Sequence, residues 1–261
     1  MDTDHDAYKP AQIAALIEGA GVTKARMALG QMLTLAILAG AFIGFGAAAY
    51  VMVMTGANPA FGPAKLLGGM VFSLGLILCV VGGAELFTGN ALMVMAAVDR
   101  KISLPEMLRS WSVVYVGNFI GAVGLALAFW FSGLLNEAVP FGATAIRIAV
   151  AKTSLNPMEM LVKGALCNAL VCLAVWLTFS ARDTTGKILA ILWPISSFVL
   201  LGLEHSIANM YLIPLGIMAG ADVTMGAALG NLFWVTLGNI IGGAGGVALA
   251  YRYAYLGGKK V

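Results

Sequence analysis

Two glutamates lie inside long apolar stretches of the sequence, each within the same short pattern, G-x-E-x-x-x-x-N. The first copy holds Glu85 and ends at Asn90, and the second holds Glu204 and ends at Asn209. A carboxylate at the centre of a membrane costs at least ~2.5 kcal/mol unless it is paired or hydrated. Each glutamate can accept backbone N–H groups where a helix is interrupted, and glycines such as Gly83 weaken a helix. The pattern therefore predicts two helix breaks, with the glutamates, Asn209 and Gly83 in structural roles.

Two further side chains in these motifs could contact a solute. His205 is the only histidine of the apolar part of the chain, since His5 lies in the polar N-terminus. A histidine at this place can donate hydrogen bonds and change its charge near neutral pH, or it can be a buried neutral group bonded to an amide. Because His205 lies beside a glutamate and within a predicted break, we favour the first of these roles, contact with a solute that passes through the protein. Thr88 could bind a small oxyanion or cap a broken helix, and the residues alone leave both open.

The composition restricts the class of protein that holds these motifs. Of the 261 residues, 61% are hydrophobic and only 10% are charged, whereas soluble domains carry about a quarter charged residues. Disorder, a nucleic-acid module and an ordinary cytosolic enzyme are therefore excluded. The three cysteines lie in apolar runs without a zinc-like spacing, so we expect neither a metal nor a cofactor. The sequence predicts an all-α membrane protein that is not an enzyme and has the lipid bilayer as its surroundings.

Charge-free runs place the membrane-spanning helices. They predict six spans, at about 29–54, 66–98, 110–136, 164–181, 188–221 and 223–251. The second and the fifth contain the glutamate motifs and are expected to be interrupted. We expect residues 1–28 to form an N-terminal segment with an amphipathic helix over 10–20, residues 29–255 to form the membrane-spanning domain, and residues 256–261 to form a C-terminal tail.

A second repeated pattern supports a division of the domain into halves. Gly117-Asn118 follows the first glutamate motif, and Gly238-Asn239 follows the second at a similar distance. Each half, about 29–135 and 157–255, holds three spans, so the two must cross the membrane in opposite directions. This is the inverted-repeat architecture of many transporters and channels.

The basic residues predict the orientation. Eleven of the fifteen fall in the N-terminal segment, the loops after the second and fourth spans, and the C-terminus. Because cytoplasmic loops carry the excess of Lys and Arg, we expect both termini to be cytoplasmic and the protein to be multi-pass in the cytoplasmic (inner) membrane. Asn58-Pro59-Ala60 matches the water-channel signature, but one copy in a loop is interpreted as a turn.

Several stretches resemble the formate/nitrite transporter family. They are FGPAKLLGGMVFSLGLILCVVGGAELFTGN at 61–90, CNALVCLAVWL at 167–177, EHSIANMYLIPLG at 204–216 and VTLGNIIGGA at 235–244. The first stretch is most similar to the formate-channel branch, whereas AKTS and KGALCN, at 151–154 and 163–168, are similar to the nitrite-channel branch. The resemblance implies a homopentamer whose protomers each have a pore and an aquaporin-like fold.

The resemblance also implies roles for single residues. It assigns an Ω-shaped loop to about Gly83–Asn90 and a second break to about Glu204–Ser206, and it identifies the central histidine and the loop threonine with His205 and Thr88. It assigns the outer basic residue to Lys152 and a pore-side amide to Asn231. The implied outer constriction consists of Leu76, Phe72 and Phe198. The implied inner constriction consists of Leu86 and Val171, with Asn168 nearby. By its apolar character, Phe87 is a further candidate for a constriction.

These observations predict a channel or transporter for formate and related small monovalent anions or their acids. Apolar rings would oppose the passage of a bare charge, and His205 could donate a proton so that the neutral acid crosses. A nitrite or hydrosulfide channel of the same family is the alternative, and a water or glycerol channel is the alternative of another class.

Overall fold

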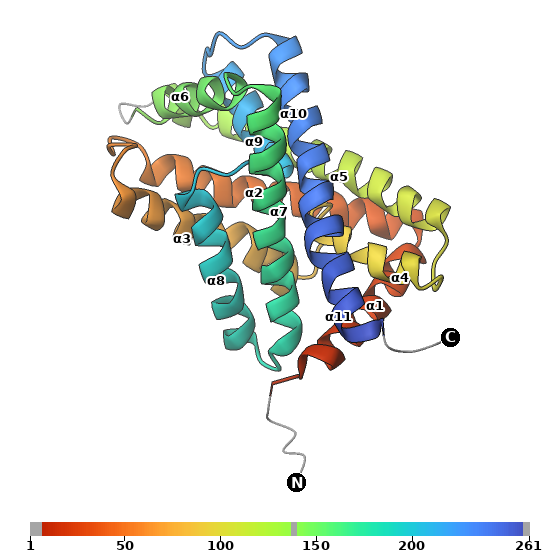
Figure 1. Ribbon diagram of the computed structural model, residues 1–261. Coiled ribbons are helices and arrows are strands. Elements are labelled where there is room, and N and C mark those ends of the chain that lie inside the picture. The colour runs from red at the N-terminus through yellow and green to blue at the C-terminus, as the bar shows by residue number, and fades with distance from the viewer. Residues whose placement is uncertain (1–6, 137–139, 258–261) are drawn as a thin grey trace.

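The charge-free runs of the sequence form long helices. The computed structural model describes residues 7–136 and 140–257, and every regular element within those ranges is a helix (Figure 1). The remaining residues, which include 258–261 of the predicted tail, lie outside the described residues. The elements are α1 (Pro10–Ala25), α2 (Leu29–Val53), α3 (Gly62–Val81), η1 (Gly89–Met93), α4 (Val94–Val98), α5 (Leu104–Phe131), η2 (Leu134–Asn136), α6 (Phe141–Thr153), α7 (Pro157–Ser180), α8 (Thr184–Leu200), α9 (Ser206–Met218), α10 (Met225–Ile240), the π-helix η3 (Ile241–Leu249) and α11 (Ala250–Leu256).

Five helical segments of the described chain are long and apolar enough to cross a membrane. They are α2, α3, α5, α7 and the continuous stretch Met225–Leu256. At 1.5 Å per residue, about 20 residues cross the ~30 Å hydrocarbon core. The apolar helices η1–α4, α8 and α9 are shorter, because two stretches that the sequence predicts as single spans are each divided by a loop.

Capping residues explain why two helices begin earlier than their charge-free cores. The predicted spans begin near 110 and 164, whereas α5 begins at Leu104 and α7 at Pro157. Ser103 caps α5 with Glu106 at the third helical position, and Asn156 caps α7 in the same way with Glu159. In a capping box the acidic side chain accepts the backbone N–H of the cap. These glutamates therefore belong to helix starts, not to loops.

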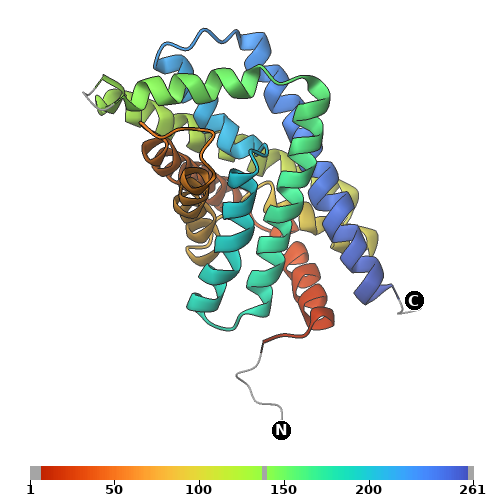
Figure 2. The ribbon, with the colours of Figure 1, turned by 60° about the vertical axis from the view of Figure 1, so that its left-hand side comes forward.

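The helix α6 has no counterpart among the predicted elements, because its sequence carries Arg and Lys among short apolar groups. Its buried residues Phe141, Ala145 and Ala149 recur every four positions, which is one face of a helix. This face packs against α9, where a side chain at Gly216 would overlap Ala149. Figures 1 and 2 place α6 at one end of the molecule and α1 and α11 at the other.

The two predicted halves pack in the same way. Helix α2 lies against α5 and α7 lies against α10. At Gly121 on α5, and at Gly242 in the π-helix that continues α10, an added Cβ would overlap the carbonyl oxygen of the facing helix, at Ile37 and Ala165 respectively. Small residues let membrane helices approach closely without a hydrophobic driving force. The glycine excess of the sequence therefore serves helix contact in both halves.

The N-terminal helix α1 is longer than the predicted stretch 10–20. It buries Ile13, Ala14 and Ile17 in a cluster that also contains residues of η1, α4, α7 and the π-helix. One face of α1 is thus covered by protein.

Candidate functional site

Two loops divide the long apolar stretches, and they have the same geometry. Gly83 and Gly202 both adopt positive φ, +81° and +67°, and each stands two residues before its motif glutamate. The next residues, Ala84 and Leu203, donate their backbone N–H to the carbonyl five residues back, at 2.8 and 3.0 Å. This is the Schellman ending of a helix, in which glycine takes the left-handed position. Residues 82–88 and 201–205 therefore separate α3 from η1 and α8 from α9.

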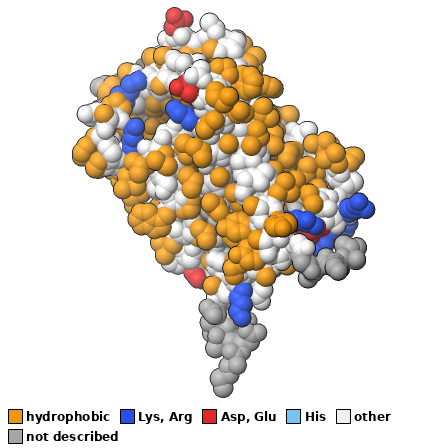
Figure 3. Space-filling view, viewed as in Figure 1, with side chains coloured by type: hydrophobic (Ala, Val, Ile, Leu, Met, Phe, Trp, Pro, Cys, Tyr) orange, Lys and Arg blue, Asp and Glu red, His pale blue; other side chains and the backbone are white. Residues whose placement is uncertain are grey.

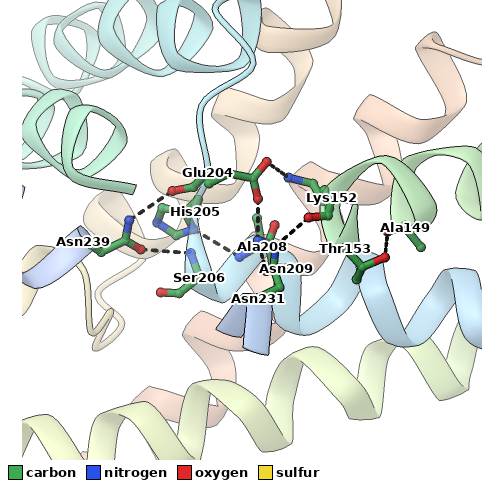
Figure 4. A network of polar contacts seen from close by, with 10 residues as sticks. All are labelled: Ala149, Lys152, Thr153, Glu204, His205, Ser206, Ala208, Asn209, Asn231 and Asn239. Carbon is green, nitrogen blue, oxygen red and sulfur yellow. Dashed lines mark hydrogen bonds and ion pairs between the residues drawn. The ribbon is translucent and has the colours of Figure 1, made fainter. Parts of the chain in front are cut away.

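The second motif glutamate is buried and fully bonded. Glu204 accepts hydrogen bonds from Lys152 Nζ at 2.9 Å and from Asn209 Nδ2 at 2.7 Å (Figure 4). Asn209 also donates to Asn231 Oδ1 at 2.8 Å, and Asn231 in turn donates to the backbone carbonyl of Lys152 at 2.9 Å. The four residues form a closed ring of contacts. Asn231 thus bonds the backbone of Lys152 and holds that lysine in place.

The first motif glutamate has the equivalent partners. Glu85 accepts from Lys24 Nζ at 2.6 Å and from Asn90 Nδ2 at 2.8 Å. Lys24 lies on α1, five residues before the first residue of α2, just as Lys152 lies on α6, five residues before the first residue of α7. The repeat therefore includes α1 and α6, which extends each half beyond its three predicted spans.

Two asparagines tie the breaks to the neighbouring helices. Asn239 donates to the Glu204 carbonyl at 3.0 Å and accepts from the Ser206 N–H at 2.9 Å (Figure 4). Asn118 makes the matching pair in the other half, at 2.9 Å for both bonds. Because unpaired buried backbone groups are costly, these bonds are what permits a helix to be interrupted here.

His205 and Thr88 join the two breaks at the centre. His205 Nδ1 accepts the N–H of Ala208 at 3.1 Å, so the histidine is the N-cap of α9. Its other ring nitrogen, Nε2, lies 2.9 Å from Thr88 Oγ1. A nitrogen that accepts carries no proton, so the hydrogen-bond network assigns the neutral tautomer with the proton on Nε2. Nε2–H therefore donates to Thr88, whose own hydroxyl proton remains free to donate.

The backbone of Thr88 is held from α7. Asn168 Nδ2 donates to the Thr88 carbonyl at 3.2 Å and to the Asn239 carbonyl at 2.7 Å, and Cys172 Sγ donates to the Thr88 carbonyl at 3.5 Å. Asn168 therefore connects the first break to the second half of the molecule. Its Oδ1 is buried without a partner among the described residues.

A cavity of about 370 Å³ leads to His205 from the α6 end. Four basic side chains, Lys65, Arg147, Lys152 and Lys163, line it with one carboxylate, that of Glu204. In Figure 3, Lys and Arg side chains gather around a hollow in the region where α6 lies. Its other lining residues are Tyr50, Met54, Pro59, Phe72, Ile148, Ala151, Leu155, Phe198, Val199, Gly202, Leu203, His205, Ala208 and Leu212.

The aromatic pair predicted for an outer constriction, Phe72 and Phe198, lies at this cavity. The rings of Phe72 and Phe198 meet edge to face with centroids 5.4 Å apart, and the Phe198 ring stacks on His205 at 5.9 Å. Leu76, the third residue predicted for the outer constriction, and the inner candidates Leu86 and Val171 are buried in the main apolar core and do not line the cavity. Phe87 packs edge to face against rings of α5, with the nearer centroid at 4.9 Å.

Sequence reasoning missed several residues of this site. In the sequence, Lys24 counts only among the basic residues of the N-terminal segment; its spacing from α2 equals that of Lys152 from α7, but the predicted spans do not show this because α7 begins before 164. Lys65, Arg147 and Lys163 are among the four basic residues outside the predicted inner segments, and no role follows for them from the sequence. Among the described residues, no three His, Cys, Asp or Glu side chains are grouped so that they could hold a metal ion.

Comparison with known proteins identifies the family. A model described as formate/nitrite transporter matches residues 11–253. The formate channel FocA of Escherichia coli (strain K12) is 39% identical, and the match covers 98% of this chain and 97% of the relative. The transporter YrhG of Bacillus subtilis (strain 168) is 42% identical over 95% of this chain and 93% of its own. These relatives are channels and transporters, not enzymes, as the sequence predicts.

Solved structures give the same result. A structure described as an FNT family ion channel has a TM-score of 0.85 at 30% identity, covering 93% of this chain and 98% of the other. A pentameric formate channel with formate bound has a TM-score of 0.81 at 39% identity, covering 87% and 98%. With its several apolar helices, the chain is a multi-pass membrane protein that belongs to the formate/nitrite transporter family.

Proposed function

We propose that this protein is a channel for formate and related small monovalent anions or their acids. The observation that carries the proposal is the hydrogen bond between Thr88 and His205, at the point where two interrupted helices meet below a cationic cavity. The named formate channels among its relatives support formate as the substrate. Small size and a single charge are what the narrow apolar segments next to this bond would select.

We further propose six spans in two inverted repeats with an aquaporin-like arrangement. The divided stretches α3 with η1–α4, and α8 with α9, would each count as one span. The matched bonds of Glu85 and Glu204, and of Asn118 and Asn239, support the repeat. Repeats of three spans cross the membrane in opposite senses, so α1 and α6 would lie at opposite surfaces, in keeping with Figure 1.

The assembly and location follow from the same reasoning. We propose a homopentamer in the cytoplasmic membrane with both termini cytoplasmic, residues 1–28 and 256–261 as terminal segments and 29–255 as the channel domain. The pentameric relative supports the assembly, and the basic residues of the inner loops support the orientation. The cavity beside α6 would then be the outer vestibule.

Passage would proceed from a charged vestibule through an apolar segment. Lys152 and its cationic neighbours raise the local concentration of an anion. The rings of Phe72 and Phe198, with Leu76 below them, exclude hydrated ions because a bare charge is costly among apolar groups. Leu86 and Val171 would form the inner constriction, with Asn168 nearby.

Thr88 is the residue whose hydroxyl would donate to the substrate once the substrate has passed the cavity. Its hydroxyl oxygen receives Nε2–H of His205, so its hydroxyl hydrogen can donate to a carboxylate oxygen. If a proton is transferred, it moves from Thr88 Oγ1 to the substrate while Nε2–H moves to Thr88. Nδ1 would then take up a proton from solvent and give up its bond to the Ala208 N–H, so the imidazole stays neutral. His205 would thus act through Thr88 as well as at the cavity, which its own ring lines.

Flux measurements in proteoliposomes test the proposed function. The entry of labelled formate into vesicles that contain the purified protein is compared with glycerol entry into the same vesicles and with empty vesicles. We expect formate entry well above the empty vesicles and glycerol entry equal to them. Glycerol entry without formate entry would refute the proposal.

A further inference from the structure

The vestibule is larger than a formate channel requires. Its volume is about 370 Å³, which falls within the ~300–1,000 Å³ range of small-molecule sites. At ~30 Å³ per water, it holds on the order of a dozen waters, whereas formate has three heavy atoms. An ion so small contacts only one wall at a time, so the rest of the cavity has room for a longer molecule.

Three cations from three different helices face this volume in addition to the Lys152–Glu204 pair. Lys65 lies on α3, Arg147 on α6 and Lys163 on α7. Within residues 7–136 and 140–257, none of the three takes part in an ion pair. The single carboxylate of the cavity already binds Lys152 and an amide. The vestibule therefore has a positive charge that no group of the described chain neutralises.

The guanidinium of Arg147 is fixed in a way that leaves donors free. One of its terminal nitrogens, Nη2, donates to the carbonyl of Met54 at the end of α2, at 3.3 Å. A guanidinium has five N–H donors in a planar fork, so the others are available to a ligand. A carboxylate can accept two of them in parallel. The lysines on the other helices can bind a second carboxylate at a distance from the first.

The inner end of the cavity is closed to a doubly charged molecule. The Phe72 and Phe198 rings stand edge to face at 5.4 Å, and Leu76, four residues further along α3, is buried in the apolar core. Moving one charge into such surroundings is costly, and moving two is more so. A dianion would therefore bind in the vestibule without passing the rings.

We propose that the vestibule is a binding site for short dicarboxylates, which occupy it as dianions and block entry from outside. One carboxylate binds Arg147, and the other binds Lys65 or Lys163. The binding requires only the cavity and its cations. The block rests on the proposed function as a formate channel.

Calorimetric titration of malonate into the purified full-length protein in nanodiscs, without formate and at low ionic strength, tests the site. Propionate is the matched probe, with the same three carbons and one carboxylate. We expect propionate to bind about tenfold more weakly, and Arg147→Gln to weaken malonate about tenfold, the equivalent of one charge-assisted hydrogen bond. Arg109→Gln, an exposed change near the α4–α5 turn, is the control and should leave binding unchanged.

Equal affinities for malonate and propionate would refute the site, as would equal effects of the two arginine variants. If Arg147→Gln does not fold because its bond to Met54 is lost, the double variant Lys65→Gln, Lys163→Gln replaces it with the same expectation. In flux assays, external malonate should slow formate entry, and Arg147→Gln should raise the half-inhibiting concentration. Unslowed entry would refute the block. Malonate binding to a protein that shows no formate flux would support the site and refute the proposed function.

Discussion

A single methyl group in the π-helix should disturb the central hydrogen bonds. Gly243 lies in η3, where it faces α7 and η1. A Cβ added there would overlap Asn168 Nδ2 and would lie 2.8 Å from Cys172 Sγ and 2.9 Å from Ala91 Cβ. Ordinary contact begins near 3.4 Å. The substitution Gly243→Ala thus forces three neighbours, two of which hold Thr88, to move by roughly half an ångström or more in a close-packed interior.

The expected losses of stability and of formate entry in Gly243→Ala follow from which neighbouring groups must move. Overpacking of this kind costs about 1–3 kcal/mol of stability. The bond from Asn168 to the Thr88 carbonyl is, at 3.2 Å, longer than its bond to the Asn239 carbonyl at 2.7 Å, so we expect it to break first. If the displacement of Thr88 raises the barrier for formate by ~1 kcal/mol, entry falls about fivefold.

A glycine of the same helix is the matched control. A Cβ at Gly245 would meet nothing within 4 Å, so Gly245→Ala should leave entry unchanged and keep or raise stability, because alanine is the better helix former. Both variants are measured by thermal unfolding in detergent and by initial formate entry into proteoliposomes. Equal unfolding midpoints and equal entry rates for the two variants would refute the close packing around Asn168 and its role in holding Thr88.

Three further outcomes are expected. Lys152→Gln leaves the buried Glu204 without its cation and should cost about 3 kcal/mol of stability, which would lower the unfolding midpoint. The control Lys163→Gln removes a lysine that has no ion pair among the described residues, so it should change the midpoint little. Burial raises the pKa of Asp99, but its hydrogen bonds with Arg252 and Glu18 and the charges of Arg252 and Lys101 together lower that pKa by more, below the ordinary 3.8. The pair therefore contributes stability above about pH 4 that is lost as the pH falls through the lowered pKa. Asp99→Asn should remove this pH dependence of the unfolding midpoint. The same pH dependence in the variant and in the unchanged protein would contradict the prediction. His205→Asn keeps an N-cap residue but loses Nε2–H, so it should alter the pH profile of formate entry while gel filtration shows an intact oligomer; an unaltered profile counts against the relay.

The sequence predicts the breaks because charge is rare in this chain. Glu85 and Glu204 stand out in apolar stretches, and an identical pattern around both identifies a repeat. Asn118 and Asn239 follow at similar distances, and the structure confirms that both tie helices together. Asn118 and Asn239 recur because they bond backbone groups that the breaks leave open. Glu85 and Glu204 instead accept from lysine and asparagine side chains, and not from the backbone N–H groups that the sequence predicts.

Other parts of the site depend on contacts that spacing does not report. The helix α6 is short and carries Arg147 and Lys152, so its sequence is similar to that of a loop. Lys24 pairs with Glu85 across sixty-one positions, and only the comparison of α1 with α6 indicates it. The tautomer of His205 depends on the N–H of Ala208, which becomes an available donor only when α9 begins at Ser206.

The central claim is that Thr88 and His205 act on the substrate as one unit. The measurement that tests it most directly is a double-mutant cycle of initial formate entry with Thr88→Val, His205→Asn and the double variant, at equal reconstituted protein. Residues that act through each other have non-additive effects. We expect the initial rate of formate entry through the double variant to lie within about twofold of the rate through the slower single variant. A double variant slowed by the product of the two single effects would show independent roles and would contradict the account.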